Sequence, residues 1–319
     1  MFYSIIIPVF NRPDEIRELL ESLSKQSEKN FEVLVVDDGS TIPCKDVVNT
    51  FTDSLDLKYF YKENTGQGFS RNYGFKKAAG DYFIVFDSDC LIPPHYIKTI
   101  DNFLNYNWLD AYGGPDRAHE SFTPIQKAIS YAMTSPFTTG GIRGNKRHAD
   151  TFHPRSFNMG ISREVFETTK GYRITRMGED IEFSIRIIKN GFKTGLIPNA
   201  FVYHKRRTSL IQFFKQLHFF GRARINISRF YPSEIKIVHT LPLLFLASLI
   251  FILLTLLWNF SLFKMLLIPV ALFFILIFFH ATFKNKKFSI GLLSTAASFI
   301  QLTAYGIGFI REYLVKIKE

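Results

Sequence analysis

Residues 81–89 read DYFIVFDSD, in which five apolar side chains in a row are followed by two carboxylates around a serine. Unbroken apolar runs are typical of parallel strands, because helices cover both faces of such a sheet. Residues 31–40, FEVLVVDDGS, repeat the pattern, and apolar runs at 3–9 and 57–61 predict two more strands. Residues 14–26 place their leucines and isoleucine on one helical face. This alternation predicts an open, doubly wound α/β sheet, which binds ligands beyond the carboxyl ends of its strands.

Carboxylates lie where such a sheet presents its ligands. Asp38 follows one predicted strand, and Asp87 and Asp89 follow another. In an extended segment the first and third residues point the same way, so Asp87 and Asp89 can share one ligand. Mg²⁺ and Mn²⁺ prefer carboxylate oxygens together with substrate phosphate. A solvated turn is the plain alternative for an acidic triplet after a strand.

A third acidic pair, Glu179 and Asp180, opens a helical pattern that runs to Asn190, with Gly191 at the C-cap position. Acidic residues also favour a helix N-terminus electrostatically, which is the alternative reading of this pair. Between these motifs, residues 111–160 are richer in glycine, serine and threonine, notably in TTGGIRGN at 138–145. This composition predicts loops around a cleft.

Beyond Lys236 the chain becomes apolar. No Asp, Glu, Lys or Arg occurs in residues 237–263, 265–283 or 288–310. Each stretch reaches the roughly 18 to 20 residues that a bilayer requires, so we predict three membrane segments. The basic turn at 284–287 is expected on the cytoplasmic side, which gives the first two segments an in-out-in path. The third segment is less apolar, and a re-entrant or interfacial path stays open for it.

The segment before the apolar region predicts a helix lying in the membrane interface, since apolar and basic side chains share it. The side chains concerned are Leu210, Phe213, Phe214 and Leu217 beside Lys215, Arg222 and Arg224. A buried amphipathic helix is the alternative. The predicted organisation is a catalytic domain over 1–207, an interfacial helix and linker over 208–236, and a membrane region with about three helices over 237–319.

The charge distribution argues against nucleic-acid binding. The net charge is +11, but residues 200–319 hold 15 Lys and Arg against 3 Asp and Glu, so the surplus lies beside the apolar segments. Such residues suit a cytoplasmic membrane edge, and no nucleic-acid motif accompanies them. Two cysteines, Cys44 and Cys90, give no disulfide framework. The N-terminus lacks a basic region before its short apolar stretch, which predicts a strand, no signal peptide and a cytoplasmic domain.

Together the motifs resemble the family 2 glycosyltransferases of the GT-A fold, over about residues 3 to 230. The resemblance implies a GT-A type, Rossmann-like open mixed sheet with helices on both faces, followed by C-terminal transmembrane helices. The matched segments are IIIPVFNR, VVDDGS, NTGQGFSRNYG, AAGDYFIVFDSD, FNMGISREVFE and GEDIEFSIRIIKNG.

On the donor side, the resemblance implies that Asp38 binds the base of a UDP-type donor and that Phe10 stacks on this base. Arg71 would contact the nucleotide, Asp87 would lie near the ribose, and Pro8 would belong to the same nucleotide-sugar site. Each group has suitable chemistry, since a carboxylate accepts from an N–H and an aromatic face stacks on a base. Core packing for Phe10, a turn or cap for Asp38 and a surface role for Arg71 stay open.

The resemblance also implies a metal and an acceptor side. Asp89 would ligate Mg²⁺ or Mn²⁺, and His204 is a second candidate ligand. Asp180 would act as the general base that takes the proton of the attacking hydroxyl, so that one in-line displacement inverts the anomeric centre. Glu179 and Asn158 would lie on the acceptor side, although strand-end packing is an equal alternative for Asn158.

One departure from the resemblance narrows the expected function. Processive synthases of this fold carry a QxxRW motif where this chain reads KQLHFFGRAR, at residues 215–224. We therefore predict transfer of one hexosyl or N-acetylhexosaminyl residue to a lipid-linked or cell-envelope glycan. The enzyme would be a multi-pass protein of the cytoplasmic (inner) membrane, with its catalytic domain in the cytoplasm. A polyprenyl-phosphate glycosyltransferase and a non-catalytic nucleotide-sugar-binding module are the alternatives; the sequence leaves the donor sugar, the acceptor and the oligomeric state open.

Overall fold

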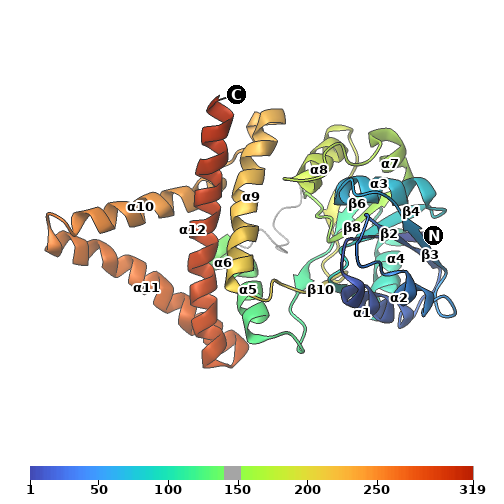
Figure 1. Cartoon of the computed structure of the whole chain (residues 1–319), viewed down its shortest axis with the longest axis horizontal. Helices are drawn as coiled ribbons and strands as arrows, with labels where there is room; N and C mark the ends of the chain where they lie inside the picture. The colour runs from blue at the N-terminus through green and yellow to red at the C-terminus, as the bar shows by residue number, and fades with distance from the viewer. Residues whose placement is uncertain (140–151, 319) are drawn as a thin grey trace. The chain divides into compact units, whose positions relative to one another are not determined.

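The computed structural model describes residues 1–139 and 152–318, which form two compact units (Figure 1). The first unit takes its described residues from Met1–His119 and Gly144–Lys205. The second takes them from Glu120–Arg143 and Arg206–Glu319. One internal segment of the chain, between the two parts of the first unit, therefore belongs to the second unit. After Lys205 the chain belongs to the second unit alone.

The first unit is built on a mixed sheet of seven described strands, in the order β3-β2-β1-β4-β8-β6-β9. Its parallel half contains β1 (Tyr3–Val9), β2 (Phe31–Asp37), β3 (Leu57–Tyr61) and β4 (Tyr82–Phe86). Its other half contains β8 (Asn158–Ser162), antiparallel to β4, followed by β6 (Ala111–Gly113) and β9 (Thr194–Leu196). The four apolar runs of the sequence are strands, and the predicted open mixed sheet is confirmed.

Helices cover both faces of this sheet, as the side chains of β1 show. Ile5 and Ile7 belong to a core that includes Leu19 of α1, whereas Ile6 belongs to a second core with Phe75 of α3 and Phe183 of α8. Such alternation follows from the twofold period of a strand. The helices of this unit are α1 (Pro13–Ser24), α2 (Lys45–Asn49), α3 (Gln67–Lys77), α4 (Tyr96–Tyr106), α7 (Arg163–Thr169) and α8 (Glu179–Lys189).

The carboxyl ends of the parallel strands share one edge of the sheet. Val9 of β1 is paired with Asp37 of β2, and the amide of Asp38 donates to the carbonyl of Val9 at 2.9 Å. Phe10 and Asp38, which directly follow the paired residues Val9 and Asp37, therefore lie next to each other at this edge of the sheet. A smaller sheet, with the order β5-β10-β7, follows β4. It consists of β5 (Cys90–Leu91), β10 (Val202–His204) and β7 (Asp116–Arg117).

The region expected to be loops contains two helices that the composition did not reveal, α5 (Pro124–Thr134) and α6 (Pro136–Thr139). A capping box begins α5, because the Thr123 side chain accepts from the amide of Gln126 while the Gln126 side chain accepts from that of Thr123. Threonine, proline and glutamine at these positions are a recognisable helix start. Residues 140–151 of the predicted loop region lie outside the described residues.

The second unit is helical throughout its described part. The predicted interfacial helix is α9 (Leu210–Phe230), and Phe213 and Leu217 on its apolar stripe are buried among residues of the same unit. These two side chains therefore pack inside the unit, and the interfacial position of α9 stays a prediction. Two short 3₁₀ turns, η1 (Pro232–Glu234) and η2 (Ile237–His239), lead to α10 (Leu241–Thr255), α11 (Phe260–Asn285) and α12 (Phe288–Lys318).

The three expected apolar helices differ in length. Among the described residues, α11 and α12 are long and apolar enough to cross a membrane, whereas α10 has 15 residues. A 15-residue helix is about 22 Å long, short of a hydrocarbon core of about 30 Å. The first of these helices is shorter than the charge-free run 237–263, because that run is broken between Thr255 and Phe260. The membrane path of the three segments stays a prediction.

Candidate functional site

The predicted nucleotide residues occupy the ends of β1 and β2. Phe10 follows β1 and is 48% exposed, so its ring is available for stacking. Pro8 lies within β1, buried, and is paired with Val36. Pro8 therefore contributes to the strand that ends directly before Phe10.

Asp38 is nearly fully buried and holds the loop before α3. Its carboxylate accepts hydrogen bonds from Lys62 Nζ at 2.5 Å, from the amide of Thr65 at 2.9 Å and from the amide of Gly66 at 2.8 Å. Burial alone would raise the pKa of Asp38, but the hydrogen bonds from Lys62 and Thr65 outweigh it and lower the pKa below its ordinary value. Ser70 also donates to this carboxylate, so the acceptor positions of Asp38 are used within the protein.

Arg71 links the acidic motif after β4 to the acidic pair that opens α8. Its guanidinium is only 1% exposed and donates from Nη2 to Oδ1 of Asp87 at 2.8 Å. Its Nη1 lies 3.7 Å from Oε1 of Glu179, which also accepts from Gln67. Arg71 also lies over the ring of Tyr172, 5.3 Å from its centroid. The two acidic motifs, 92 positions apart in the chain, therefore share one buried cation.

Glu179 and Asp180 have different surroundings. Burial and the neighbouring charge of Asp180 raise the pKa of Glu179 above its ordinary value, although Arg71 opposes this. The side chain of Asp180 is 23% exposed, and its Oδ2 lies 3.4 Å from Nη1 of Arg155. Its Oδ1 accepts from the amide of Ile181 at 2.9 Å. Asp180 is thus the member of the pair that solvent and a substrate can reach.

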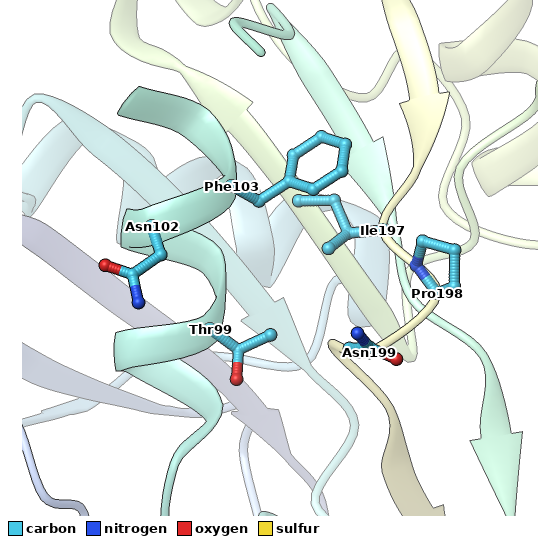
Figure 2. A pocket seen from close by; sticks show the side chains of 6 residues that line it. All are labelled: Thr99, Asn102, Phe103, Ile197, Pro198 and Asn199. Carbon is cyan, nitrogen blue, oxygen red and sulfur yellow. The ribbon is translucent and has the colours of Figure 1, made fainter. Parts of the chain in front are cut away.

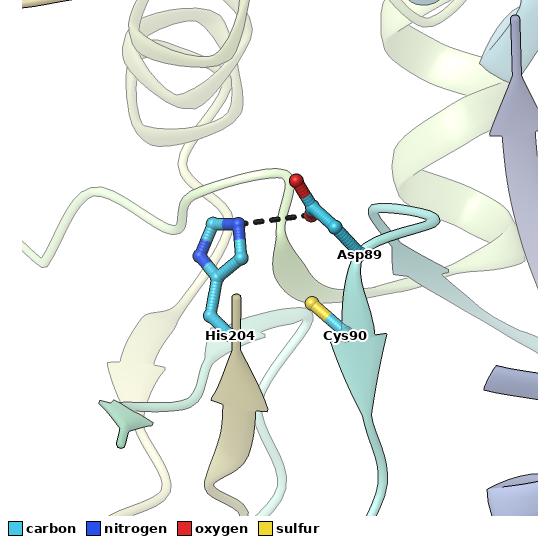
Figure 3. A group of neighbouring side chains, drawn as sticks. All are labelled: Asp89, Cys90 and His204. Atoms are coloured by element: carbon cyan, nitrogen blue, oxygen red, sulfur yellow. Dashed lines mark ion pairs between the residues drawn. The ribbon is translucent and has the colours of Figure 1, made fainter. Parts of the chain in front are cut away.

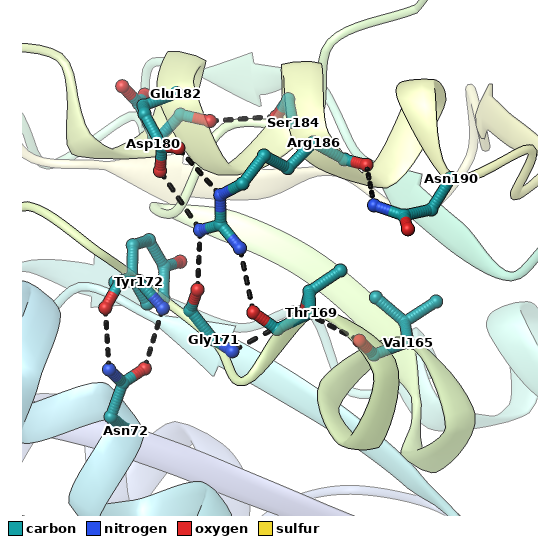
Figure 4. A network of polar contacts seen from close by, with 10 residues as sticks. All are labelled: Asn72, Val165, Thr169, Gly171, Tyr172, Asp180, Glu182, Ser184, Arg186 and Asn190. Carbon is teal, nitrogen blue, oxygen red and sulfur yellow. Dashed lines mark hydrogen bonds and ion pairs between the residues drawn. The ribbon is translucent and has the colours of Figure 1, made fainter.

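A buried arginine holds the segment that precedes this pair (Figure 4). Arg186 of α8 donates to the carbonyls of Thr169 at 2.8 Å and Gly171 at 2.5 Å, and it forms a bidentate pair with Glu182 at 2.6 and 2.9 Å. Bidentate pairs of this kind restrict geometry strongly. Asn72 of α3 adds two contacts to the backbone of Tyr172, both at 2.7 Å. The segment from Thr169 to Tyr172, which leads toward α8, is therefore anchored to α8 and to α3.

Asp89, directly before β5, and His204, at the end of β10, lie close together (Figure 3). His204 Nε2 lies 3.0 Å from Asp89 Oδ1, and Arg12 donates from Nη1 to Asp89 Oδ2 at 2.9 Å. One ligand atom each from Asp89, Cys90 and His204 lie within 4.8 Å of one another. The His204 ring stacks on Phe157, with centroids 5.0 Å apart. An oxygen, a nitrogen and a sulfur donor at this separation fit a transition metal ion, since imidazole is a better ligand for such ions than for Mg²⁺.

Asn158 follows Phe157 and contacts core residues. It is fully buried at the start of β8, its Nδ2 donates to the carbonyl of Ala200 at 2.8 Å, and its Oδ1 accepts from Tyr96 at 2.6 Å. This geometry favours the packing role at the strand end over the acceptor-side role.

Several polar partners of the site were not identified from the sequence, namely Arg12, Lys62, Gln67, Cys90 and Arg155. Arg12, Gln67 and Cys90 lie within or next to the matched motifs, so their positions carried a usable signal. Lys62 and Arg155 lie between motifs, and only the fold brings them to Asp38 and Asp180.

A shallow pocket in the first unit lies away from these residues (Figure 2). It has a volume of about 400 Å³ and is formed by α4 and the segment after β9. Its lining residues are Thr99, Asn102, Phe103, Ile197, Pro198 and Asn199. None of them is a predicted site residue, so the pocket adds nothing to the chemistry above.

Comparison with known proteins gives this geometry a context. The family model described as glycosyl transferase family 2 matches residues 4–169. An uncharacterized glycosyltransferase of Rickettsia felis is 38% identical over 141 residues, which cover 44% of this chain but only 22% of the relative. A relative from Methanococcus voltae is 26% identical over 266 residues, covering 80% of this chain and 82% of the relative. It is named dolichyl N-acetyl-alpha-D-glucosaminyl phosphate 3-beta-D-2,3-diacetamido-2,3-dideoxy-beta-D-glucuronosyltransferase.

Two solved structures share the fold. The mannosyltransferase PcManGT from Pyrobaculum calidifontis, in complex with GDP-Man and Mn²⁺, has a TM-score of 0.68 at 16% identity, and the match covers 98% of this chain and 87% of that one. Residues 1–349 of S. aureus TarS, in complex with UDP-GlcNAc, have a TM-score of 0.50 at 21% identity, with 71% of this chain and 67% of that one covered.

Proposed function

Because this chain belongs to glycosyl transferase family 2 and so transfers sugar from a nucleotide sugar, we propose that it uses a metal-dependent, inverting mechanism. The acceptor is a lipid-linked or cell-envelope glycan at the cytoplasmic face of a membrane. The observation that carries this proposal is the contact of Arg71 with both Asp87 and Glu179, at 2.8 and 3.7 Å. This contact joins the motif of Asp87, proposed for the donor, to the motif of Glu179, proposed for the acceptor.

The donor side is proposed to hold a UDP-sugar. Phe10 offers an exposed ring for the base, and the buried Asp38 lies at the end of the neighbouring strand. The S. aureus TarS structure, which contains UDP-GlcNAc, supports the choice of a UDP-sugar.

Asp89 and His204 are the proposed ligands of a divalent ion, with Mn²⁺ preferred over Mg²⁺ because of the imidazole. Such an ion would supply positive charge against the departing diphosphate. Arg12 holds the other oxygen of Asp89 and so orients the carboxylate. The PcManGT structure, which contains Mn²⁺, supports this choice.

On the acceptor side, Asp180 is the proposed general base. The attacking hydroxyl gives its proton to Asp180, its oxygen bonds to the anomeric carbon, and the bond from that carbon to the diphosphate breaks with its electron pair. The nucleoside diphosphate leaves on the opposite side, which inverts the centre. Glu179 is buried against Arg71 and Gln67, so its proposed role is to position the start of α8.

A membrane-bound acceptor is supported by two observations. Among the described residues, α11 and α12 have the length and apolar composition of membrane helices. The Methanococcus voltae relative, whose match covers 80% of this chain, is named for transfer to a dolichyl-linked sugar phosphate. Transfer to a sugar already on a lipid is thus favoured over direct loading of polyprenyl phosphate.

The test is transfer of labelled sugar from a panel of UDP- and GDP-sugars to a membrane lipid extract, with MnCl₂ and the full-length chain in detergent. The proposal predicts an organic-extractable product from a UDP-sugar, from which mild acid releases the label as an oligosaccharide with an intact new linkage. Release of the label as a monosaccharide would indicate a sugar phosphate lipid and the polyprenyl-phosphate alternative. Binding of nucleotide sugars without any transfer or hydrolysis would indicate a non-catalytic module.

A further inference from the structure

The second unit contains two helices that lie side by side, α9 and α12 (Figure 1). A Cβ on Gly221 of α9 would meet the carbonyl oxygen of Tyr305 at 2.1 Å, and a Cβ on Gly308 of α12 would meet that of His218 at 2.0 Å. Both glycines therefore allow the two backbones to touch.

Ion pairs extend this contact toward the ends of both helices. Glu312 of α12, only 6% exposed, accepts from Arg222 and from Arg229 of α9, each at 2.8 Å. Lys316 donates to the hydroxyl of Ser228 at 3.0 Å. His218 lies beside Gly308 near one end of this contact and Ser228 beside Lys316 near the other, so α9 and α12 run parallel (Figure 1). They must therefore have the same orientation toward a membrane.

The basic residues of α9 indicate whether this pair of helices crosses the membrane or lies in its interface. The helix α9 carries Lys215, Arg222, Arg224 and Arg229 within 15 positions, and its first residue follows the catalytic unit by five positions. Cations within the hydrocarbon are costly, and Glu312 can compensate for only one of these four. Amphipathic helices with such a basic face lie in the interface. If α9 lies in the interface, α12 lies there too.

The surroundings of α12 agree with this. Half of the most apolar 18-residue stretch of α12 is buried within the protein, compared with 6% of the corresponding stretch of α11. Ala297 and Ala304, in the middle of α12, pack against Ile129 of α5 and Phe213 of α9. The helix α5 has 11 residues, about 16 Å, which is too short to accompany a spanning helix. The middle of α12 is therefore covered by helices that do not span.

The hairpin of α10 and α11 has the opposite character. Figure 1 shows these helices meeting at a tip away from α9 and α12. At the tip, Leu257 and Trp258 are 80% and 63% exposed. Both ends of the hairpin are basic, with Lys236 before it and Lys284 at its close. Apart from Lys264 near the tip, no charged residue occurs between Lys236 and Lys284, and an exposed apolar hairpin with cationic ends fits insertion from one face of a bilayer.

We propose that α9 and α12 form one interfacial platform and that the α10–α11 hairpin alone enters the bilayer, which places the end of α12 on the catalytic side. This inference depends on the membrane association proposed above. By length and composition alone, α12 would count as a membrane-spanning helix. The proposal instead leaves α12 outside the hydrocarbon core.

Thiol labelling in sealed inside-out vesicles tests the proposal. Both native cysteines are 1% exposed, so the unsubstituted chain serves as the blank. Single cysteines are introduced as Asp53→Cys on an exposed turn of the catalytic unit, as Trp258→Cys at the hairpin tip, and as one residue added after Glu319. The vesicles are first floated on a density gradient, which reports membrane association separately.

We expect a membrane-impermeant maleimide to label Asp53→Cys and the added C-terminal cysteine to the same extent without detergent. Trp258→Cys should be labelled only after detergent is added. A C-terminal cysteine that requires detergent while Asp53→Cys does not would give α12 a spanning path and overturn the inference. Labelling of Trp258→Cys in intact vesicles would overturn the insertion of the hairpin, and failure to float would overturn the membrane association itself.

Discussion

Arg71 is buried and donates from Nη2 to Oδ1 of Asp87 at 2.8 Å. The same guanidinium faces Glu179 at 3.7 Å. A buried cation between two carboxylates from distant motifs fixes the separation of the proposed donor and acceptor groups. Its removal would leave buried carboxylate charge without compensation.

Arg71→Lys keeps the positive charge but removes the planar fork that reaches both carboxylates. Loss of a hydrogen bond to a charged group costs about 1.5–3 kcal/mol, so we expect kcat to fall by about 10- to 100-fold with little change in KM for the donor. Steady-state kinetics measure this split, and Lys76→Met, an exposed change on the same helix, is the control. A raised donor KM with unchanged kcat would instead make Arg71 a nucleotide contact.

Asp38→Asn should change how stability depends on pH. The pKa of Asp38 is lowered in the folded protein, so the unfolded state binds more protons as pH falls below about 3.9. The stabilisation by Asp38 is complete above that pH and is lost as pH falls through the folded pKa. Urea unfolding of the wild type and Asp38→Asn from pH 3 to 7 should show a difference that shrinks toward acid, with Asp46→Asn as the surface control. A constant difference would contradict the role of Lys62 and Thr65.

His204→Ala should raise the Mn²⁺ concentration required for half-maximal transfer. Loss of outer-shell partners already costs about 10- to 100-fold in metal affinity, so loss of a direct ligand should cost at least about tenfold. Activity titrated against MnCl₂ after EDTA treatment measures the effect, with exposed His95→Ala as the control. An unchanged titration curve would remove His204 from the metal site, and full activity in excess EDTA would remove the metal from the mechanism.

Arg186→Met tests the anchor of α8. The variant leaves Glu182 buried without its partner and frees the carbonyls of Thr169 and Gly171, which should destabilise the first unit by about 3–5 kcal/mol. Chemical unfolding followed by far-UV circular dichroism measures this, and Lys189→Met at the exposed end of α8 is the control. Equal stability of the two variants would show that the network in Figure 4 carries no net stabilisation.

The sheet could be predicted because its strands are unbroken apolar runs, as β4 and β2 illustrate. The helix α5 was missed because its region was judged by its glycine and serine content, whereas the local start signal at Thr123 was not weighed. The break between α10 and α11 was missed because a charge-free run shows where apolar residues are and gives no helix end. Thr255 and Phe260 belong to the same apolar run, yet the first residue ends α10 and the second begins α11.

The candidate site was partly predictable. Carboxylates at strand ends are visible in sequence because the fold puts them at one edge, and this led to Asp38, Asp87 and Asp89. The pairing of side chains could not be predicted in this way, since the contact of Asp180 with Arg155 depends on how one loop folds back onto α8. The burial of Arg71 was likewise hidden, because an arginine on a helix is usually exposed.

The central claim is that Asp180 takes the proton of the acceptor hydroxyl, and Asp180→Asn tests it most directly. The amide keeps the size of the side chain but cannot accept the proton. With saturating donor, acceptor and MnCl₂, transfer should fall by about 10²- to 10⁴-fold while UDP binding, measured by calorimetry, stays near the wild-type value. Glu167→Gln, an exposed carboxylate of the same unit, should leave both unchanged. Wild-type turnover by Asp180→Asn would contradict the account.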